Sequence, residues 1–138
     1  SEERGAYVWY PGTDELDVSV LLHAMTGFDR GPRMSSTIDA VREELGRGPL
    51  MYRYSGMEKE EGAFVACSFW TVAALATVGR REEAVDLMDE MLPLANDVGL
   101  FTEMIDPEDN SFLGNFPQAL SHLALLNAAV ALEQAALE

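Results

Sequence analysis

The sequence predicts an all-α fold built from helical hairpins in two layers. Five helical segments alternate between two hydrophobic patterns: three are apolar on all sides, and the two between them carry one apolar stripe. A helix that is apolar all round is buried on all sides, whereas a striped helix lies at a surface. The three buried segments begin roughly 50 residues apart, which indicates a repeat of helical hairpins. We therefore expect an inner layer of buried helices covered by an outer layer of amphipathic ones.

The first hairpin is expected to follow a short aromatic lead-in over residues 1–12. Thr13 can cap a helix that runs to about Met25, because a hydroxyl oxygen can accept a backbone N–H of the first turn. The second helix, about Pro32–Leu45, has apolar residues at spacings of three and four, and Gly46 ends it. This hairpin therefore pairs a buried helix with a surface helix.

The second hairpin pairs a third helix, about Gly62–Val78, with an amphipathic fourth helix. Gly79 stops the third helix and the fourth begins almost at once, so the connection between them is very short. Pro93 should kink or shorten the fourth helix, because proline lacks the N–H that a helix interior needs. The hairpin again runs from a buried to a surface helix.

The fifth helix, about Phe116–Leu137, returns to the pattern that is apolar on all sides. Asn115 is expected to cap it, with Pro117 in its first turn. The links that precede the third and fifth helices are long, and long loops in compact domains are usually functional. We therefore expect the functional site at the N-terminal ends of the inner helices.

Length and composition limit the classes of partner. At 138 residues with 48% hydrophobic side chains, residues 1–138 fit one domain. The net charge of −15 repels phosphate backbones and anionic membranes, so we expect neither nucleic acid nor a membrane as a partner. The apolar run over residues 64–79 has 16 residues, fewer than the roughly 20 that span a bilayer.

Cys67 indicates the cellular compartment and the limits of the chemistry. As the only cysteine it cannot form an internal disulfide, so we expect a reducing, cytoplasmic compartment and a buried, inert thiol. The sequence contains no glycine-rich phosphate loop and no cysteine pair with metal-ligand spacing. We therefore expect no cofactor and no metal.

Three groups of polar and aromatic residues fall at the predicted functional end. They are Tyr10 with Asp14, Glu15 and Asp17; Tyr52, Arg53 and Tyr54 with Glu60, Glu61 and Phe64; and Glu103 with Asn115 and Gln118. Helix capping, a salt bridge or core packing would explain each group separately. Charged groups pair with sugar hydroxyls and aromatic faces stack on sugar C–H surfaces, so their coincidence favours a neutral polyhydroxylated ligand. Tyr10 and Glu61 are therefore candidate substrate contacts.

Three long segments of the sequence resemble glycoside hydrolase family 15, the glucoamylase, glucodextranase and bacterial trehalase-like enzymes. They are TDELDVSVLL, YRYSGMEKEEGAFVACSFWTVAAL and FTEMIDPEDNSFLGNFPQALSHLALLNAA. The resemblance implies an (α/α)6 barrel, of which this chain would form the C-terminal part of the catalytic domain. It also implies inverting hydrolysis of α-glucosidic bonds in oligo- or disaccharides.

The same resemblance implies roles for individual residues. Glu103 in TEMID matches the family's general base, although Met104 follows it where the family commonly has Gln or Glu. Arg53 and Tyr54 match a sugar-binding pair, and Phe64 matches an aromatic position at the glucose subsite.

The tryptophan-glutamate motif of the family's general acid has no match in this chain. An inverting glycosidase needs an acid and a base roughly 6.5–9.5 Å apart with a water between them. We therefore expect the N-terminal part of the same enzyme to supply the acid. The isolated chain is then expected to be inactive and to form a homo-oligomer through apolar helix flanks. The alternative is a free-standing helical-hairpin module that binds a partner or glycan without catalysis.

Overall fold

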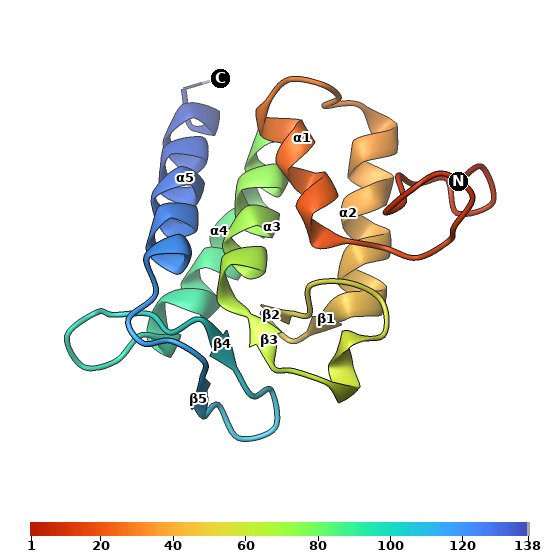
Figure 1. The fold of residues 1–138 in the computed structure, drawn as a ribbon. Helices are drawn as coiled ribbons and strands as arrows, with labels where there is room; N and C mark the ends of the chain where they lie inside the picture. The colour runs from red at the N-terminus through yellow and green to blue at the C-terminus, as the bar shows by residue number, and fades with distance from the viewer. Residues whose placement is uncertain (138) are drawn as a thin grey trace.

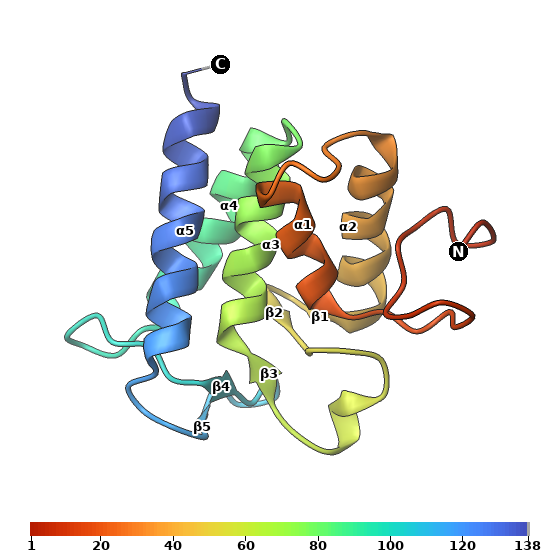
Figure 2. The same ribbon diagram turned by 45° about the horizontal axis from the view of Figure 1, so that its top comes forward.

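The fold is described from a computed structural model that covers residues 1–137, apart from the side chain of Lys59 (Figure 1). The main helices follow in order as η1 Val18–Leu21 continuing into α1 Leu22–Met25, α2 Pro32–Leu45, α3 Val65–Thr77, α4 Arg81–Met91 and α5 Ala119–Ala135. Figures 1 and 2 both place α3 between α1 and α5, with α2 and α4 outside this row. None of the described helices combines the length and the hydrophobicity that a bilayer crossing requires.

The predicted alternation of inner and outer helices is clearest in the second hairpin. Every residue of α3 from Val65 to Ala76 is buried except Trp70, whereas α4 buries only the stripe of Ala84, Leu87, Met88 and Met91. The outer helix α2 likewise buries one stripe, namely Met34, Thr37, Ile38, Val41 and Leu45. The core therefore lies around α3, which contacts every other main helix.

Short strands connect the helices, and the sequence did not predict them. They are β1 Gly46–Arg47, β2 Leu50–Met51, β3 Ala63–Phe64, β4 Met104–Ile105 and β5 Phe112–Leu113. β1 and β2 pair antiparallel, and a separate antiparallel sheet has the order β3-β4-β5. Each strand has two residues, too short for its hydrophobic alternation to stand out in the sequence. Two 3-10 turns, η2 Met57–Lys59 and η3 Leu92–Leu94, complete the described elements.

The predicted ends of the outer helices are confirmed. α2 spans Pro32–Leu45, and Gly46 is its C-cap. α4 ends at Met91, and Pro93 lies in the 3-10 turn η3 that follows, as expected for a residue that cannot continue a helix. These boundaries depend on local backbone chemistry, so the sequence is sufficient to locate them.

The predicted start of the first helix is wrong. The helix begins at Val18, and Asp17 rather than Thr13 caps it by accepting a backbone N–H through its carboxylate. The Thr13 hydroxyl accepts from the Glu15 N–H within a local turn. The segment before the helix is extended because Asp17 pairs with Tyr54 in an antiparallel bridge. Long-range pairing thus replaces the first turn that the local sequence favours.

The predicted start of the fifth helix is also wrong. α5 begins at Ala119 with Gln118 as its N-cap residue, and Pro117 lies outside the helix after a cis peptide bond. Asn115 does not cap the helix, because its side chain donates a hydrogen bond to Glu103 instead. Capping propensity is therefore overridden by a contact with the preceding strand region.

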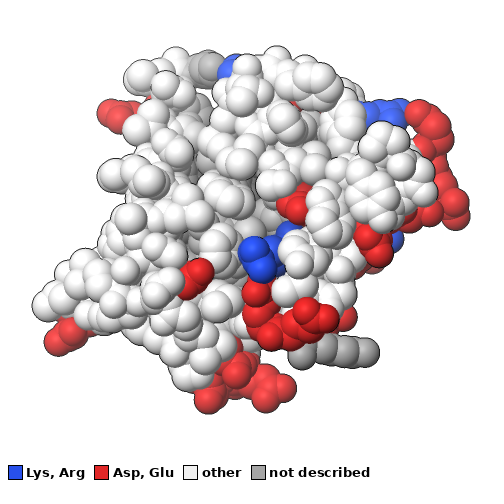
Figure 3. Space-filling view, in the orientation of Figure 1, with Lys and Arg blue, Asp and Glu red and all other residues white. Residues whose placement is uncertain are grey.

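The composition of the fifth helix predicted burial on all sides, and this prediction is wrong. Ser121, Ala124 and Ala128 are buried against the core, but Leu123, Leu126 and Val130 expose 57%, 61% and 52% of their surface. Figure 3 shows a largely uncharged surface over the α5 side of the molecule, with only scattered acidic side chains. The first helix departs in the same way, with Ser19 and His23 exposed. Both helices therefore present flanks that no described residue covers.

Candidate active site

The three-stranded sheet lies at the N-terminal ends of α3 and α5 (Figures 1 and 2). β3 runs directly into α3, with Phe64 as the N-cap residue, and the chain after β5 leads into α5. β3 pairs with β4 so that Phe64 lies opposite Met104, and the Val65 N–H donates to the Glu103 carbonyl at 3.0 Å. This pairing brings the segment of Arg53 and Phe64 beside the segment of Glu103.

The N-terminal lead-in pairs with the same region from the other side. The Val18 N–H donates to the Arg53 carbonyl at 2.9 Å, and the Ser55 N–H donates to the Leu16 carbonyl at 3.0 Å. The Asp17–Tyr54 bridge lies between these two bonds. Backbone hydrogen bonds therefore link all three groups of residues that the sequence analysis identified.

Glu103 is half-buried and is held by Asn115 across the β4–β5 hairpin. Its backbone N–H donates to the Asn115 carbonyl at 2.9 Å. Its Oε2 accepts from the Asn115 backbone N–H at 2.8 Å and from Nδ2 of the same residue at 2.9 Å. The carboxylate therefore has a fixed orientation at the N-terminal end of the inner layer.

Arg53 and Glu61 form a bidentate ion pair. Nε of Arg53 donates to Oε1 of Glu61, and Nη2 donates to Oε2 at 2.9 Å. The guanidinium carbon lies 5.5 Å from the ring centres of both Tyr54 and Phe64. The hydrogen bond to Glu61 raises the pKa of Arg53 above its usual value, against the opposing effect of burial. Arg53 is therefore a charged donor whose position is set by a carboxylate and two aromatic rings.

Tyr10 is connected to this cluster through Trp9. The Trp9 ring lies 4.7 Å from the Tyr54 ring and 5.6 Å from the Tyr10 ring, measured between centres. Both Trp9 and Tyr10 are exposed. Sequence reasoning selected Tyr10 and missed Trp9, although its position beside Tyr10 before a Pro-Gly turn was a usable signal. The structure thus places an aromatic ladder of Tyr10, Trp9 and Tyr54 next to Arg53.

Several residues of the three predicted groups lie elsewhere. Asp14, Glu15 and Glu60 are exposed, and Asp17 is the helix cap described above. Tyr52 is buried and faces Arg47, whose guanidinium carbon lies 5.3 Å from its ring centre. The Gln118 N–H donates to the Phe101 carbonyl at 3.0 Å. Structural roles therefore explain Asp17, Tyr52 and Gln118, whereas Asp14, Glu15 and Glu60 are surface acids.

The prediction of a buried thiol is confirmed, because Cys67 in the first turns of α3 is fully buried. Burial raises its pKa well above the usual range, so the thiol stays protonated. Among the described residues, no group of three or more His, Cys, Asp or Glu side chains has an arrangement suited to a metal ion.

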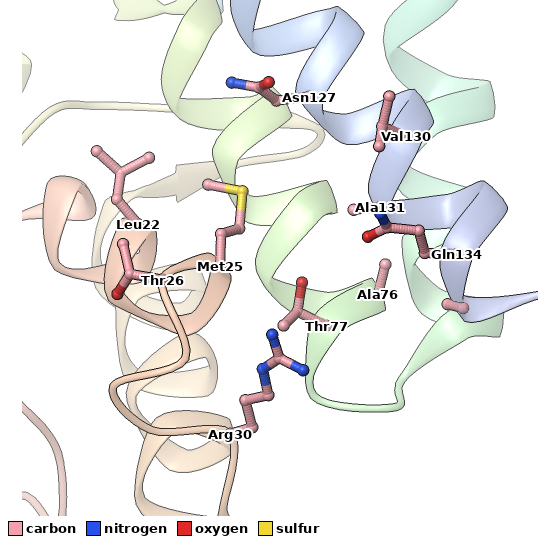
Figure 4. Close-up of a pocket in the computed structure, with 11 residues that line it drawn as sticks. Leu22, Met25, Thr26, Arg30, Ala76, Thr77, Asn127, Val130, Ala131 and Gln134 are labelled. Carbon is pink, nitrogen blue, oxygen red and sulfur yellow. The ribbon is translucent and has the colours of Figure 1, made fainter.

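A cavity of about 360 Å³ lies away from Glu103, between α1, α3 and α5 (Figure 4). Its lining comes from the C-terminal ends of α1 and α3, including Met25 and Thr77, and from Asn127 and Gln134 on α5. Figure 4 shows the Arg30 side chain extending toward Thr77 from the loop after α1. The cavity therefore lies at the opposite end of the inner layer from the candidate active site.

The sequence is similar to known trehalases along nearly its whole length. It is 40% identical over 137 residues to a trehalase of Mycolicibacterium smegmatis, covering 94% of this chain and 20% of that protein. It is 34% identical over 142 residues to a trehalase of Thermoplasma volcanium, covering 99% of this chain and 23% of that protein. The chain thus spans about a fifth of the length of these relatives.

A solved structure supports the predicted fold, and a family model identifies the family. A solved structure titled "Glycosidase Wild Type" superimposes with a TM-score of 0.80 at 19% identity, covering 94% of this chain and 39% of the other. This likeness confirms the predicted fold, helical hairpins that form part of an (α/α)6 barrel. The family model described as glycosyl hydrolases family 15 matches residues 2–130. The chain therefore belongs to glycosyl hydrolases family 15.

Proposed function

We propose that residues 1–138 form a single all-α domain, the C-terminal portion of the catalytic barrel of an inverting glucosidase. In this proposal Glu103 is the general base, and Arg53, Tyr54, Glu61, Phe64 and Tyr10 form part of the sugar pocket. The observation that carries the proposal is the fixed Glu103 carboxylate next to β4, which pairs with the strand of Phe64, whose ring lies against the guanidinium of the Arg53–Glu61 pair. A base and a set of charged and aromatic sugar contacts are what the reaction requires on this side of the substrate.

The proposed reaction is a direct displacement at the anomeric carbon. Glu103 takes a proton from a water molecule while the water oxygen bonds to the anomeric carbon. The glycosidic C–O bond breaks, and its electron pair stays on the leaving oxygen. A general acid on the N-terminal part of the same enzyme then protonates that oxygen. The anomeric configuration is inverted because the water attacks from the face opposite the leaving group.

The sugar pocket is proposed around the Arg53 guanidinium. Glu61 engages Nε and Nη2, so Nη1 remains to donate to a sugar hydroxyl, and no described residue bonds to it. The rings of Tyr54 and Phe64 lie against the guanidinium and help to hold it in place, and in this proposal their solvent-facing parts contact sugar C–H groups. Because the matched relatives are trehalases, trehalose is the first α-glucoside to test.

The remaining partner in this proposal is the N-terminal part of the same enzyme. Leu123, Leu126 and Val130 form an exposed apolar flank on α5, and monomeric proteins rarely keep large patches of this kind. The cavity that Arg30 enters lies on the same side, between α1 and α5. Covering this flank would complete the inner layer. Cytoplasmic location remains a prediction from the sequence.

The experiment measures turnover by the full-length enzyme that contains this chain. Trehalose, maltose and isomaltose are incubated with the enzyme, and the first sugar released is identified by proton NMR. Release of β-glucose from an α-glucoside is the expected result for an inverting enzyme. Binding of these sugars without release would favour the alternative, a helical-hairpin binding module, and initial release of α-glucose alone from trehalose would contradict the inverting mechanism.

A further inference from the structure

We infer that Asn115 is a positioning residue that fixes the Glu103 carboxylate and leaves Oε1 as the oxygen that receives the proton from water. The inference rests on the proposed role of Glu103 as the base. It goes further because it assigns different tasks to the two carboxylate oxygens and names the residue that separates them.

Three hydrogen bonds join the same two residues. Oε2 of Glu103 accepts from the Asn115 backbone N–H at 2.8 Å and from its side-chain Nδ2 at 2.9 Å. In the opposite direction, the Glu103 backbone N–H donates to the Asn115 carbonyl at 2.9 Å. Because the backbone bond fixes the two main chains relative to each other, the two bonds to Oε2 hold the carboxylate itself.

The glycine before Asn115 makes this approach possible. Gly114 has a φ of +74°, a conformation that side-chain-bearing residues rarely adopt. A Cβ at this position would lie 2.6 Å from Oε2 of Glu103 and 3.0 Å from the terminal methyl of Met104. Any larger residue at position 114 would therefore displace the carboxylate. Gly114 therefore leaves room for Oε2 of Glu103, and Asn115 donates the hydrogen bonds that hold it.

The two oxygens consequently differ in what they can do. Oε2 already accepts two N–H donors, whereas no described residue donates to Oε1. Met104, the neighbour of Glu103 in the chain, has a thioether side chain, which has no donor to offer. Oε1 is therefore the oxygen available to an attacking water.

The test compares variants of the full-length enzyme by kcat, KM and the pH dependence of kcat/KM. Asn115→Ala removes the Nδ2 donor, and we expect kcat to fall about 10- to 100-fold because the carboxylate keeps only one of its two donors and is held less firmly. KM is expected to change less than about twofold, because Asn115 does not touch the sugar in this account.

Asn115→Asp is the sharper variant, because it is isosteric and places a carboxylate against Oε2. Two adjacent carboxylates raise the pKa of one of them, so the acid limb should move up by about 1 pH unit or more. Ser111→Ala is the matched control: it removes an exposed polar group from the same hairpin and should leave all three quantities unchanged. Unfolding midpoints identify variants that lose structure.

Two outcomes separate this inference from the proposed function. If Glu103→Gln is inactive but both Asn115 variants keep the wild-type kcat and pH limb, Asn115 has no positioning role and the proposed base stands. If Glu103→Gln remains active, the base assignment fails and the inference fails with it. Should Asn115→Ala not fold, the isosteric Asn115→Asp variant decides alone: a wild-type pH limb in it overturns the inference.

Discussion

Replacing Arg53 with alanine is expected to weaken substrate use by the full-length enzyme without abolishing catalysis. The guanidinium is held by Glu61 through two hydrogen bonds and lies against the rings of Tyr54 and Phe64. This arrangement fixes its direction before a ligand binds, so little side-chain freedom remains to be lost on binding. In the account given above, its loss removes hydrogen bonds to sugar hydroxyls.

The size of the effect follows from the kind of hydrogen bond that is lost. A hydrogen bond to a charged group contributes about 1.5–3 kcal/mol, which corresponds to about 10- to 150-fold in kcat/KM. Arg53 exposes 40% of its side chain and Glu61 exposes 20%, so the ion pair itself is partly screened by solvent. Most of the kinetic loss is therefore expected to come from the substrate contact.

The assay measures kcat and KM for glucose release from trehalose or another α-glucoside that the enzyme cleaves. Glu61 loses its partner in Arg53→Ala, so a cycle with Glu61→Gln and the double variant separates that effect. Arg53→Lys keeps the positive charge but cannot form the planar two-bond contact, and an intermediate loss is expected. Unchanged kinetics in Arg53→Ala, together with a lower unfolding midpoint, would show that Arg53 only forms a structural salt bridge.

Two further predictions concern the fold. Arg80→Ala should lower the free energy of unfolding, measured in urea, by about 1 kcal/mol. Arg80 forms ion pairs at 2.7 Å with Asp39 of α2 and with Glu83 of α4, and so connects the two helices. Arg81→Ala, at an exposed position, is the control, and equal effects of the two substitutions would contradict a stabilising role for these ion pairs. The isolated 138-residue chain should self-associate at micromolar concentration and release no glucose, and Leu126→Glu should shift it toward monomer. A stable wild-type monomer in sedimentation equilibrium would show that the α5 flank needs no cover.

Local sequence rules were sufficient where a residue restricts its own backbone. Pro32, Gly46, Gly79 and Pro93 lie at or just beyond the ends of α2, α3 and α4 as predicted, because proline and glycine act within one turn of the helix. The hydrophobic periods of these helices were informative for the same reason. The apolar stripe that is visible along each segment is the face that packs into the core around α3.

Long-range pairing explains what the sequence could not locate. Thr13 and Asn115 both have side chains that suit a helix cap, yet the first precedes an extended segment bridged to Tyr54 and the second binds Glu103. Both outcomes depend on a partner 12 or more residues away in the chain. The contact of Trp9 with Tyr54 likewise exists only after the lead-in has paired.

The sequence was sufficient to predict which groups of residues form the candidate site, but not the contacts between them. Arg53, Tyr54 and Glu61 lie close together in the chain, so their association was visible in the sequence. The difference in hydrogen bonding between the two oxygens of Glu103 depends on the β4–β5 hairpin, which brings Gly114 and Asn115 next to Glu103. No periodicity or motif reports such a contact.

The central claim is that Glu103 is the base, and the kcat of Glu103→Gln in the full-length enzyme tests it most directly. The amide has nearly the same shape but cannot take a proton from water, so kcat should fall by about 10²- to 10⁴-fold. The Kd for a non-hydrolysed glucoside should stay within about twofold, and Glu108→Gln, an exposed acid of the same hairpin, should behave as wild type. A Glu103→Gln enzyme that keeps more than about a tenth of the wild-type kcat would contradict the account.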